Sequence, residues 1–530
     1  MIYEELKVDG YQVIQEKYGI SELAAKVLAS KHLDDVMINK LLYTDMKTSD
    51  FDLSFIKDII TCIQKAKQNN EKIMICGDYD CDGICATTIL YDALKRYGCD
   101  CGYYIPDRFT EGYGVNMNTI KAAVEKDYKV LITVDNGVKA TNELQFAKEQ
   151  GLQVILSDHH AYDEEDLVYD YFLHPNILDP FYGKLCGTGL AYLISKALIG
   201  DDPYHTVLAC IATVGDMVGV LDANRVIIKE GIHLLKTMDF PAITLLSDTS
   251  NHWDATKIAF QIVPKMNALG RLADEANVNT LVRYLLIRDR ASLEKVAVQI
   301  NRLNEKRKKI SATNEKEALS LVDETQAFII VNSESFHEGL NGVVAAKISK
   351  KYQRPAMVLT QKGSTLKGSI RSVGIDISTF FDEFKDQLLS FGGHRQAAGI
   401  SLKETVLEDL IDYTQMKCEI EFKEEHQPYL SLKREDVTLK AIESLSSLEP
   451  FGVDFEKPKF MIYEDELDAS VMSNGLHLKF KSPYMEYVYF QHGHLLNSLA
   501  GKPITFIGDL GINVFRNKKT VNMIVDDVIE

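Results

Sequence analysis

The sequence predicts an α/β protein of several domains: a parallel-sheet domain, a long connecting helix, a second α/β domain and a small C-terminal β-barrel. From Lys72, short β-rich runs alternate with helical runs, as in a parallel sheet with crossover helices. Residues 284–322 form a helical pattern with almost no breakers. After residue 427 short strands dominate, at the spacing of a small barrel or sandwich. The length of 530 residues suits three or four domains of roughly 150 residues.

Each element follows from a local pattern. Residues 1–70 are predicted to form amphipathic helices, for example in YQVIQEKYGI. The parallel-sheet domain is expected over 71–283, with strands in KIMIC, CGYYIP, KVLITV and LQVILS and with mostly helical sequence over 188–250. The connecting helix is expected over 284–322, the second α/β domain over 323–417 and the barrel over 427–530, after the acidic stretch CEIEFKEEH.

Composition excludes several classes of protein. Fifty-nine basic and seventy-seven acidic residues give a net charge of −18, which argues against a protein that coats nucleic acid over its whole surface, although a local basic groove is still possible. No apolar run approaches the ~18 residues of a membrane helix, and the acidic start MIYEELKVDG predicts no secretory signal. We therefore expect no membrane association and a cytoplasmic location. The nine cysteines contain no CxxC pair, so we expect buried thiols rather than a zinc ribbon.

The predicted long helix carries a run of positive charge. Eight basic residues stand against three acids within 288–309. These side chains form either a solvated helix face or a basic rail that faces a phosphate backbone, and periodicity alone favours the solvated face.

The strongest chemical signal is KIMICGDYDCDG. An apolar strand leads into a turn that bears Asp78, Asp80 and Asp82. Because like charges repel, three close carboxylates indicate a bound cation. An EF-hand would need a preceding helix and a glutamate at the loop's twelfth position, which is Ile89 here. The remaining alternative, an acidic surface turn, is less favoured because α/β sheets place ligands at strand ends.

Two further strand ends repeat this arrangement. Asp135 follows KVLITV, and Asp158, His159 and His160 follow LQVILS. In a parallel sheet these turns share one edge, so the side chains are expected to converge. Carboxylate and imidazole ligands together suit Mn²⁺ or Mg²⁺, and this many ligands suggests two ions that promote phosphoryl displacement.

These residues carry a family resemblance. DHH at 158–160, after GDYDCDG and a strand-end aspartate, resembles the DHH phosphoesterase superfamily, and within it the RecJ-type single-stranded-DNA-specific exonucleases. The similarity covers nearly the whole chain, and its specific stretches are YYIPDRFTEGYG, ATVGDMVGVLDANR, VPKMNALGRLAD, HEGLNGVVAAKISKKYQRPAMVL, KGSIRS and FGGHRQAAG. The resemblance implies a DHH domain, a DHH-associated domain with the glycine-rich FGGHRQAAG, and a C-terminal OB-fold.

The resemblance also assigns site residues. The implied metal ligands are Asp78, Asp80, Asp82, Asp135, His159 and Asp216. His160 is expected near the scissile phosphate, as an acid or in the outer shell, and Asp158 is expected to orient a histidine. Two departures stand out: GSIRS places Ile370 where the family usually has glycine, and DMVGVLDANR lacks a common proline.

Contacts to DNA are implied in the same way. Arg271, Ser369, Arg371 and His394 are candidates for a 5′-phosphate pocket, because guanidinium groups bind phosphate bidentately. The alternative for Arg271 is a salt bridge to Asp274 or Glu275. Aromatic side chains that could stack on bases, together with nearby basic residues, occur in two places: Tyr103, Tyr104, Arg108, Phe109 and Tyr113, and in the barrel Phe480, Tyr484, Tyr487, Tyr489 and Phe515 with Arg516, Lys518 and Lys519.

The resemblance therefore implies a metal-dependent exonuclease that degrades single-stranded DNA from the 5′ end to mononucleotides, in DNA repair and recombination. Two divalent ions, Mn²⁺ or Mg²⁺, would be its cofactors, and a single-strand-binding protein and a helicase its partners. One alternative is a DHH phosphodiesterase of short oligoribonucleotides or cyclic dinucleotides. Another is a non-catalytic DNA-binding replication scaffold, which predicts lost ligands, whereas all six positions are intact.

Overall fold

The computed structural model describes residues 2–43, 45–112, 114–248, 253–418, 426–515 and 518–529. The chain divides into two compact units. One comprises Lys47–Val218 and Asp222–Lys423, and the other comprises Met1–Met46, Gly219–Leu221 and Glu424–Glu530. No helix in the described part of the chain is long and apolar enough to cross a membrane.

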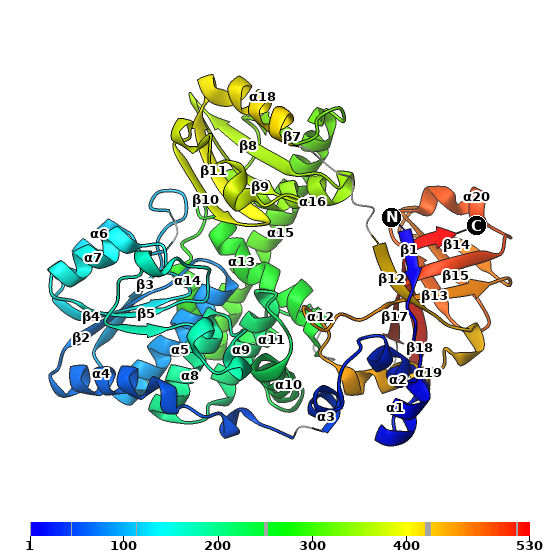
Figure 1. The fold of residues 1–530 in the computed structure, drawn as a ribbon, viewed down its shortest axis with the longest axis horizontal. Helices are drawn as coiled ribbons and strands as arrows, with labels where there is room; N and C mark the ends of the chain where they lie inside the picture. Colours follow the sequence, from blue (N-terminus) through cyan, green and yellow to red (C-terminus); the bar gives the residue numbers. More distant parts are fainter. Residues whose placement is uncertain are drawn as a thin grey trace. The chain divides into compact units, whose positions relative to one another are not determined.

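The larger unit begins with a five-stranded, wholly parallel sheet, as the sequence predicts (Figure 1). Its strands, in spatial order, are β3 (Cys101–Tyr104), β2 (Lys72–Cys76), β4 (Tyr128–Val134), β5 (Gln153–Ser157) and β6 (Tyr171–Leu173). Apolar residues fill the strands because both faces of the sheet are covered. In register, Cys76 pairs with Thr133 and Thr133 with Leu156, so the three central strands end at one edge.

Helices cover both faces of this sheet. Helices α6 (Met117–Glu125) and α7 (Thr141–Glu149) pack on one face, where Ile120 and Leu144 meet Leu131 and Leu156. On the other face lie α4 (Lys57–Gln68), α5 (Cys81–Tyr97) and α8 (Gly187–Ile199). The predicted helical stretch continues as α9 (Pro203–Gly215), α10 (Asp222–Thr237), α11 (Pro241–Thr244), α12 (Ala255–Lys257), a π-helix (Ile258–Ile262), α13 (Val263–Arg271) and α14 (Asn279–Leu286).

The predicted connecting helix is α15 (Arg290–Leu321). Half of the basic residues within 288–309 form ion pairs with acids: Arg288 with Asp92, Arg290 with Glu294, Lys306 with Glu275 and Lys308 with Glu305. These pairs neutralise much of the charge run, as expected of a solvated helix face.

A second α/β domain follows α15. Its mixed sheet has the order β10 (Ser390–His394), β11 (Ala397–Lys403), β9 (Thr365–Arg371), β8 (Ala356–Lys362) and β7 (Ile329–Ser333). Helix α16 (Asn341–Tyr352) packs on one face, and α17 (Ile377–Phe380) and α18 (Leu407–Lys417) pack on the other. The side chain of Ile370 is fully buried in the hydrophobic core between this sheet and helices α17 and α18. Its neighbours Ser369 and Arg371 point to the opposite face of the sheet. The isoleucine that replaces the usual glycine therefore does not displace their side chains.

The other unit is an eight-stranded sheet with helices. Its strands, in order, are β1 (Ile2–Glu5), β12 (His426–Ser431), β13 (Lys459–Glu464), β17 (Ile504–Phe515), β18 (Lys518–Ile529), β16 (Glu486–Tyr489), β15 (His477–Lys481) and β14 (Asp468–Met472). Its helices are α1 (Tyr11–Tyr18), α2 (Glu22–Ala29), α3 (Asp35–Tyr43), α19 (Leu439–Ser444) and α20 (Leu496–Leu499). The sequence predicted helices over residues 1–70, but Ile2–Glu5 form a strand because they pair in parallel with β12.

Three of the expected aromatic platforms in this unit belong to its core. Phe480 and Tyr487 are 0% exposed and Tyr489 is 6% exposed, so the prediction that they stack on bases is wrong. Phe480 and Tyr487 pack against Phe506 on the inward-facing side of their strands, and Tyr489 stacks on His492. Tyr484 is exposed, and Lys519 pairs with Glu443. Arg516 and the side chain of Phe515 lie outside the described residues.

All nine cysteines are free and buried, which confirms the prediction of buried thiols.

Candidate metal centre

Acidic and imidazole side chains meet at the carboxyl edge of the parallel sheet. Asp78 follows β2, Asp135 follows β4, and Asp158 and the two histidines follow β5. Three overlapping groups have potential ligand atoms within 4.8 Å of one another: Asp135 with His159 and His160, Asp82 with His159 and Asp216, and Asp78 with Asp80 and Asp135. The structure thus brings together all six residues that the resemblance implied as ligands.

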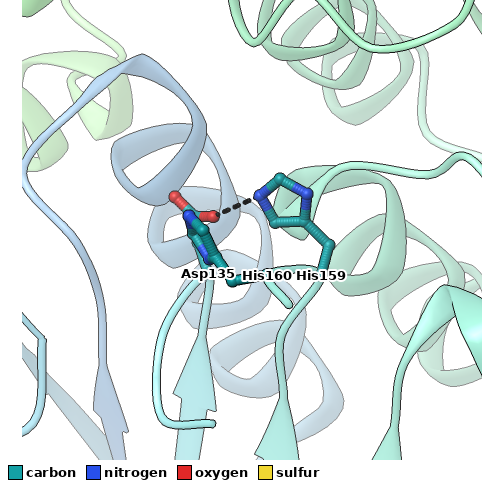
Figure 2. Close-up of side chains that lie close together, drawn as sticks. All are labelled: Asp135, His159 and His160. Atoms are coloured by element: carbon teal, nitrogen blue, oxygen red, sulfur yellow. Dashed lines mark ion pairs between the residues drawn. The ribbon is translucent and has the colours of Figure 1, made fainter. Parts of the chain in front are cut away.

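Asp135 and His159 lie at the centre of this arrangement. His159 Nε2 is 3.0 Å from Asp135 Oδ1, and Figure 2 shows the imidazole ring turned toward the carboxylate. His159 Nε2 also lies 3.7 Å from Asp82 Oδ2 and 3.7 Å from Asp216 Oδ2. Asp135 itself adopts a left-handed backbone conformation with φ of 62°, which aspartate tolerates better than most residues.

Two helix N-termini hold the aspartates of the first motif. Asp80 is the N-cap of α5, and its Oδ1 accepts hydrogen bonds from the backbone N–H groups of Asp82 and Gly83 at 3.0 and 3.1 Å. Asp82 in turn accepts bonds from the N–H groups of Gly187 (2.7 Å) and Thr188 (2.8 Å) at the start of α8. Helix N-termini stabilise carboxylates, so both side chains are fixed before any cation binds.

Asp158 orients His160. The Asp158 carboxylate is buried, and its Oδ1 lies 2.7 Å from His160 Nδ1 while its Oδ2 accepts a bond from Val138 N–H at 3.0 Å. Burial alone would lower the pKa of His160, but the hydrogen bond to Asp158 raises it to about 9. His160 Nδ1–H therefore donates to Asp158, and in the metal-free centre the raised pKa favours the protonated ring at neutral pH. This contact has the geometry expected of a carboxylate that orients a histidine, and the role of the pair stays a prediction.

A further histidine, which the sequence analysis did not single out, supports this loop. His174 Nδ1 accepts a bond from Asn176 N–H at 3.1 Å, which leaves the proton on Nε2 to donate to the carbonyl oxygen of His160 at 2.9 Å. It follows β6, the next strand along the same sheet edge. Asp135 and His159 were predicted because they follow strands of the sheet, and the same reasoning would have indicated His174.

The electrostatics of the centre favour a divalent cation. Burial and the charge of Asp80 raise the pKa of Asp78 to about 7, and burial together with Asp82 and Asp80 raises the pKa of Asp216 to about 9. Four buried atoms of the centre have no hydrogen-bond partner among the described residues: Asp78 Oδ1, Asp135 Oδ1, His159 Nε2 and Asp216 Oδ2. Converging, unpartnered oxygen and nitrogen atoms are the donor set that Mn²⁺ and Mg²⁺ take. The residues present therefore fit such ions.

A group of arginines lies beside this centre. Burial, followed by the positive charges of Arg108, Arg307 and Arg371, lowers the pKa of Arg271 to about 10. Asp274 pairs with His337 and Glu275 with Lys306, so the expected alternative of a salt bridge from Arg271 to either acid is not formed. We call Arg108, Arg271, Arg307 and Arg371 the arginine cluster. Sequence reasoning missed Arg307 as an individual, since it stands within a charged helical run.

Most of the other residues predicted to contact DNA lie around the arginine cluster. Arg371 and Ser369 both approach Gly342, whose added Cβ would lie 2.8 Å from Arg371 Nη2 and 3.5 Å from Ser369 Oγ. Arg108 lies over the Tyr79 ring at 4.9 Å. The Tyr104 hydroxyl donates to Glu111 at 2.6 Å, and the Tyr104 ring packs against the sheet core.

His394, on the edge strand β10, lies at the metal centre. Its ring stacks on that of His160 with centroids 5.5 Å apart. Tyr103 packs edge-on against Tyr91 at 4.9 Å, as expected of a core aromatic. Tyr113 lies outside the described residues.

Comparison with known proteins accounts for this arrangement. Family models match residues 72–214 (DHH family, N-terminal domain), 325–419 (DHHA1 domain) and 430–527 (RecJ OB domain). The chain is 31% identical to the single-stranded-DNA-specific exonuclease RecJ of Bacillus subtilis, over 98% of this chain and 69% of that protein. It is 28% identical to RecJ of Haemophilus influenzae, over 89% of this chain and 90% of that protein.

Solved structures agree with these matches. The crystal structure of RecJ from Thermus thermophilus in complex with Mn²⁺ superposes with a TM-score of 0.85 at 23% identity, covering 100% of this chain and 79% of that one. A crystal structure of exonuclease RecJ bound to manganese superposes with a TM-score of 0.62 at 28% identity, over 69% of this chain and 95% of that one. From its sequence, its domains and its fold, the chain belongs to the RecJ family of the DHH superfamily.

Proposed function

We propose that this chain is a metal-dependent exonuclease that hydrolyses single-stranded DNA from the 5′ end to mononucleotides, in DNA repair and recombination. One observation carries the proposal: unpartnered carboxylate and imidazole atoms converge directly beside an arginine cluster. The first arrangement suits a metal-assisted phosphoryl displacement, and the second suits a terminal phosphate. The relatives' names as single-stranded-DNA-specific exonucleases support the same substrate.

The metal ligands proposed are Asp78, Asp80, Asp82, Asp135, His159 and Asp216. Two bound divalent ions, Mn²⁺ or Mg²⁺, would supply an activated water and neutralise charge on the phosphoryl oxygens. Asp80 and Asp82 are held by helix N-termini, so they present their oxygens with little reorganisation. His160, charged and oriented by Asp158, faces the same centre. We assign it to stabilise the phosphate charge and to donate a proton to the leaving 3′ oxygen as the phosphorus–oxygen bond breaks.

The arginine cluster explains the choice of a strand end. Arg271 and Arg371 would hold a 5′-phosphate with Ser369, and Arg108 would contact the next phosphate. Charge-assisted, bidentate contacts of this kind hold a phosphate with defined geometry. These positive side chains lie close together, and no carboxylate among the described residues forms an ion pair with Arg271. A dianionic terminal phosphate therefore interacts with the arginines more favourably than an uncharged hydroxyl end does.

The phosphodiesterase alternative shares this metal centre. The match to the RecJ OB domain over residues 430–527 favours the longer substrate, because OB-folds bind single strands. A helicase that exposes single strands and a single-strand-binding protein are the partners that such a substrate implies, and the cytoplasm is the location we propose.

The test is cleavage of end-labelled oligonucleotides in Mn²⁺ and in EDTA. We expect hydrolysis of long 5′-phosphorylated single strands, little hydrolysis of blunt duplex or of dinucleotides, and none in EDTA. Asp80→Ala is expected to bind DNA but not to cut it, whereas Asp163→Asn, at an exposed surface pair with Lys139, is a matched control with normal activity. Sustained cleavage by pure Asp80→Ala protein would refute the site assignment, and a preference for dinucleotides would favour the alternative.

A further inference from the structure

The loop that carries Arg108 also contacts the second α/β domain. The Phe109 ring lies 6.0 Å from the ring of His337, and Lys362 Nζ lies 5.8 Å from the Phe109 centroid. His337 Nε2 in turn lies 3.2 Å from Asp274 Oδ1. Phe109 lies within the DHH match and Asp274 just after α13, whereas His337 and Lys362 lie within the DHHA1 match, so these contacts join the DHHA1 domain to the segments before it.

Gly339 forms the tightest part of this junction. A Cβ added to Gly339 would lie 1.9 Å from the carbonyl oxygen of Arg271 and 3.0 Å from Phe109 Cζ. The first distance is far below contact range, and its partner is backbone that cannot rotate away. Three residues later, a Cβ on Gly342 would meet the Arg371 guanidinium at 2.8 Å. One short segment of the DHHA1 domain therefore touches the backbone of Arg271 and the side chain of Arg371.

This junction, formed by Phe109, Asp274, His337, Gly339 and Lys362, is named the latch. The arginine cluster is built from separate segments: Arg108 lies within the DHH match, Arg271 ends α13, Arg307 lies on α15, and Arg371 lies within the DHHA1 match. Their like charges repel one another, which pushes these segments apart when no phosphate is bound. The latch contacts lie next to the cluster and oppose that separation.

We propose that the latch sets the spacing of the segments that form the arginine cluster, and that Phe109 and Gly339 are positioning residues for selection of a 5′-phosphorylated end. The inference rests on the proposed function. Neither residue has a side chain that binds phosphate, so the side-chain substitutions act through the arginines. Geometry is critical here because bidentate contacts fail with small displacements, and a shift of about 1 Å can cost on the order of 100-fold in rate.

Two variants perturb the spacing in different ways. Phe109→Ala removes the aromatic contact to His337 and Lys362, and Gly339→Ala inserts a methyl group against the Arg271 carbonyl oxygen. Thr110→Ala is the matched control, since Thr110 lies in the same loop, is exposed and contacts Asp107. Arg371→Ala is the positive control for loss of the phosphate contact.

The assay compares kcat and KM for the same single-stranded oligonucleotide with a 5′-phosphate and with a 5′-hydroxyl. We expect Phe109→Ala and Gly339→Ala to reduce the wild-type preference for the phosphate about tenfold, mainly through KM, as Arg371→Ala does. Phe109→Leu keeps an apolar side chain and adds no atom at Cζ, which faces Gly339, so it is expected to retain more of the preference than Phe109→Ala. Fluorescence anisotropy in EDTA gives a second readout, in which the same variants lose the difference in affinity between the two oligonucleotides.

The outcomes separate the two levels of inference. If wild type and Arg371→Ala behave as expected but both latch variants keep the wild-type preference, the latch proposal is overturned and the proposed function stands. Equal losses on both oligonucleotides also overturn it, because a purely structural defect would affect them alike. If the wild-type protein does not cut single-stranded DNA, the proposed function and the latch proposal fail together. Should Phe109→Ala not fold, Lys362→Ala and Gly339→Ala give the decisive comparison.

Discussion

Replacing Asp135 with asparagine should stabilise the metal-free protein while abolishing hydrolysis. Asp135 Oδ1 and His159 Nε2 lie 3.0 Å apart, and both are buried without a hydrogen-bond partner among the described residues. An amide N–H at position 135 can donate to His159 Nε2 at any pH, whereas the Asp135 carboxyl group must first take up a proton to do so. Asparagine also tolerates the left-handed backbone at this position. The substitution therefore repairs the metal-free site without changing its shape.

The magnitude follows from these contacts. The new hydrogen bond is worth about 1 kcal/mol. Burial and the charges of Asp82 and Asp80 raise the pKa of Asp135 well above its usual range, and removing this unfavourable carboxyl group relieves at least about 1 kcal/mol more at pH 7. A gain of about 2 kcal/mol raises the melting temperature by about 2.5 °C for a unit as large as the one that holds Asp135.

Thermal unfolding by circular dichroism measures the effect in EDTA and along a Mn²⁺ titration. Wild type should gain about 2.7 kcal/mol at 100 times the dissociation constant of the ion, whereas Asp135→Asn should start higher and gain little. Asp163→Asn should match wild type in both conditions. A lower melting temperature of Asp135→Asn in EDTA, or an undiminished response to Mn²⁺, would refute the assignment of Asp135 as a ligand held in a strained, metal-free cluster.

Three further predictions test other parts of the chain. Arg371→Ala should raise KM for 5′-phosphorylated single strands about 10- to 100-fold in steady-state assays, because a charge-assisted contact worth about 2 kcal/mol is lost; an unchanged KM would contradict the phosphate pocket. Gly83→Ala should abolish hydrolysis and lower the melting temperature, since its Cβ would lie 2.5 Å from the Asp78 carbonyl oxygen; normal activity would show that the α5 start is more adaptable than the geometry indicates. Burial opposes ionisation of Asp92, but hydrogen bonds from His205 and Arg96 lower its pKa to about 2. Asp92→Asn should therefore cost about 2 kcal/mol at pH 7, a difference that is present above pH ~4 and disappears as the pH falls toward 2, measured by urea unfolding.

The fold could be predicted where its pattern is local. In the parallel-sheet domain, each strand and the helix that follows it lie within about 30 residues of each other in the chain. The alternation of strands and helices is therefore visible in the sequence. The pairing of β1 with β12 is not visible in the sequence, because Ile2 and His426 are far apart in the chain and a strand of four mostly exposed residues shows no alternation of buried and exposed positions. The barrel strands show alternation, but alternation alone does not tell which face is the core, and this is why Phe480 and Tyr487 were misassigned.

Some residues of the candidate site could be predicted from local sequence patterns, and others could not. Asp78, Asp135 and His159 follow apolar strands, and the register of a parallel sheet brings such positions together. Asp216 ends helix α9, where no local pattern marks it, and only the family resemblance pointed to it. The N–H groups of Gly187 and Thr188 that hold Asp82 come from a helix more than 100 residues away in the chain. Backbone donors leave no signature in side-chain chemistry, so sequence reasoning had no access to them.

The distribution of charge reconciles an acidic protein with a nucleic-acid substrate. With a net charge of −18, the chain as a whole repels DNA, and ion pairs such as Lys306 with Glu275 cancel much of the positive charge on α15. The arginine cluster is different, because burial, followed by the charges of Arg108, Arg307 and Arg371, lowers the pKa of Arg271, so positive charge is gathered there. Attraction is thus concentrated at one place beside the metal centre, and an acidic surface elsewhere disfavours unproductive binding of strands. Salt should accordingly weaken binding of a 5′-phosphorylated end with a slope set by a few contacts, rather than by the many of a coating protein.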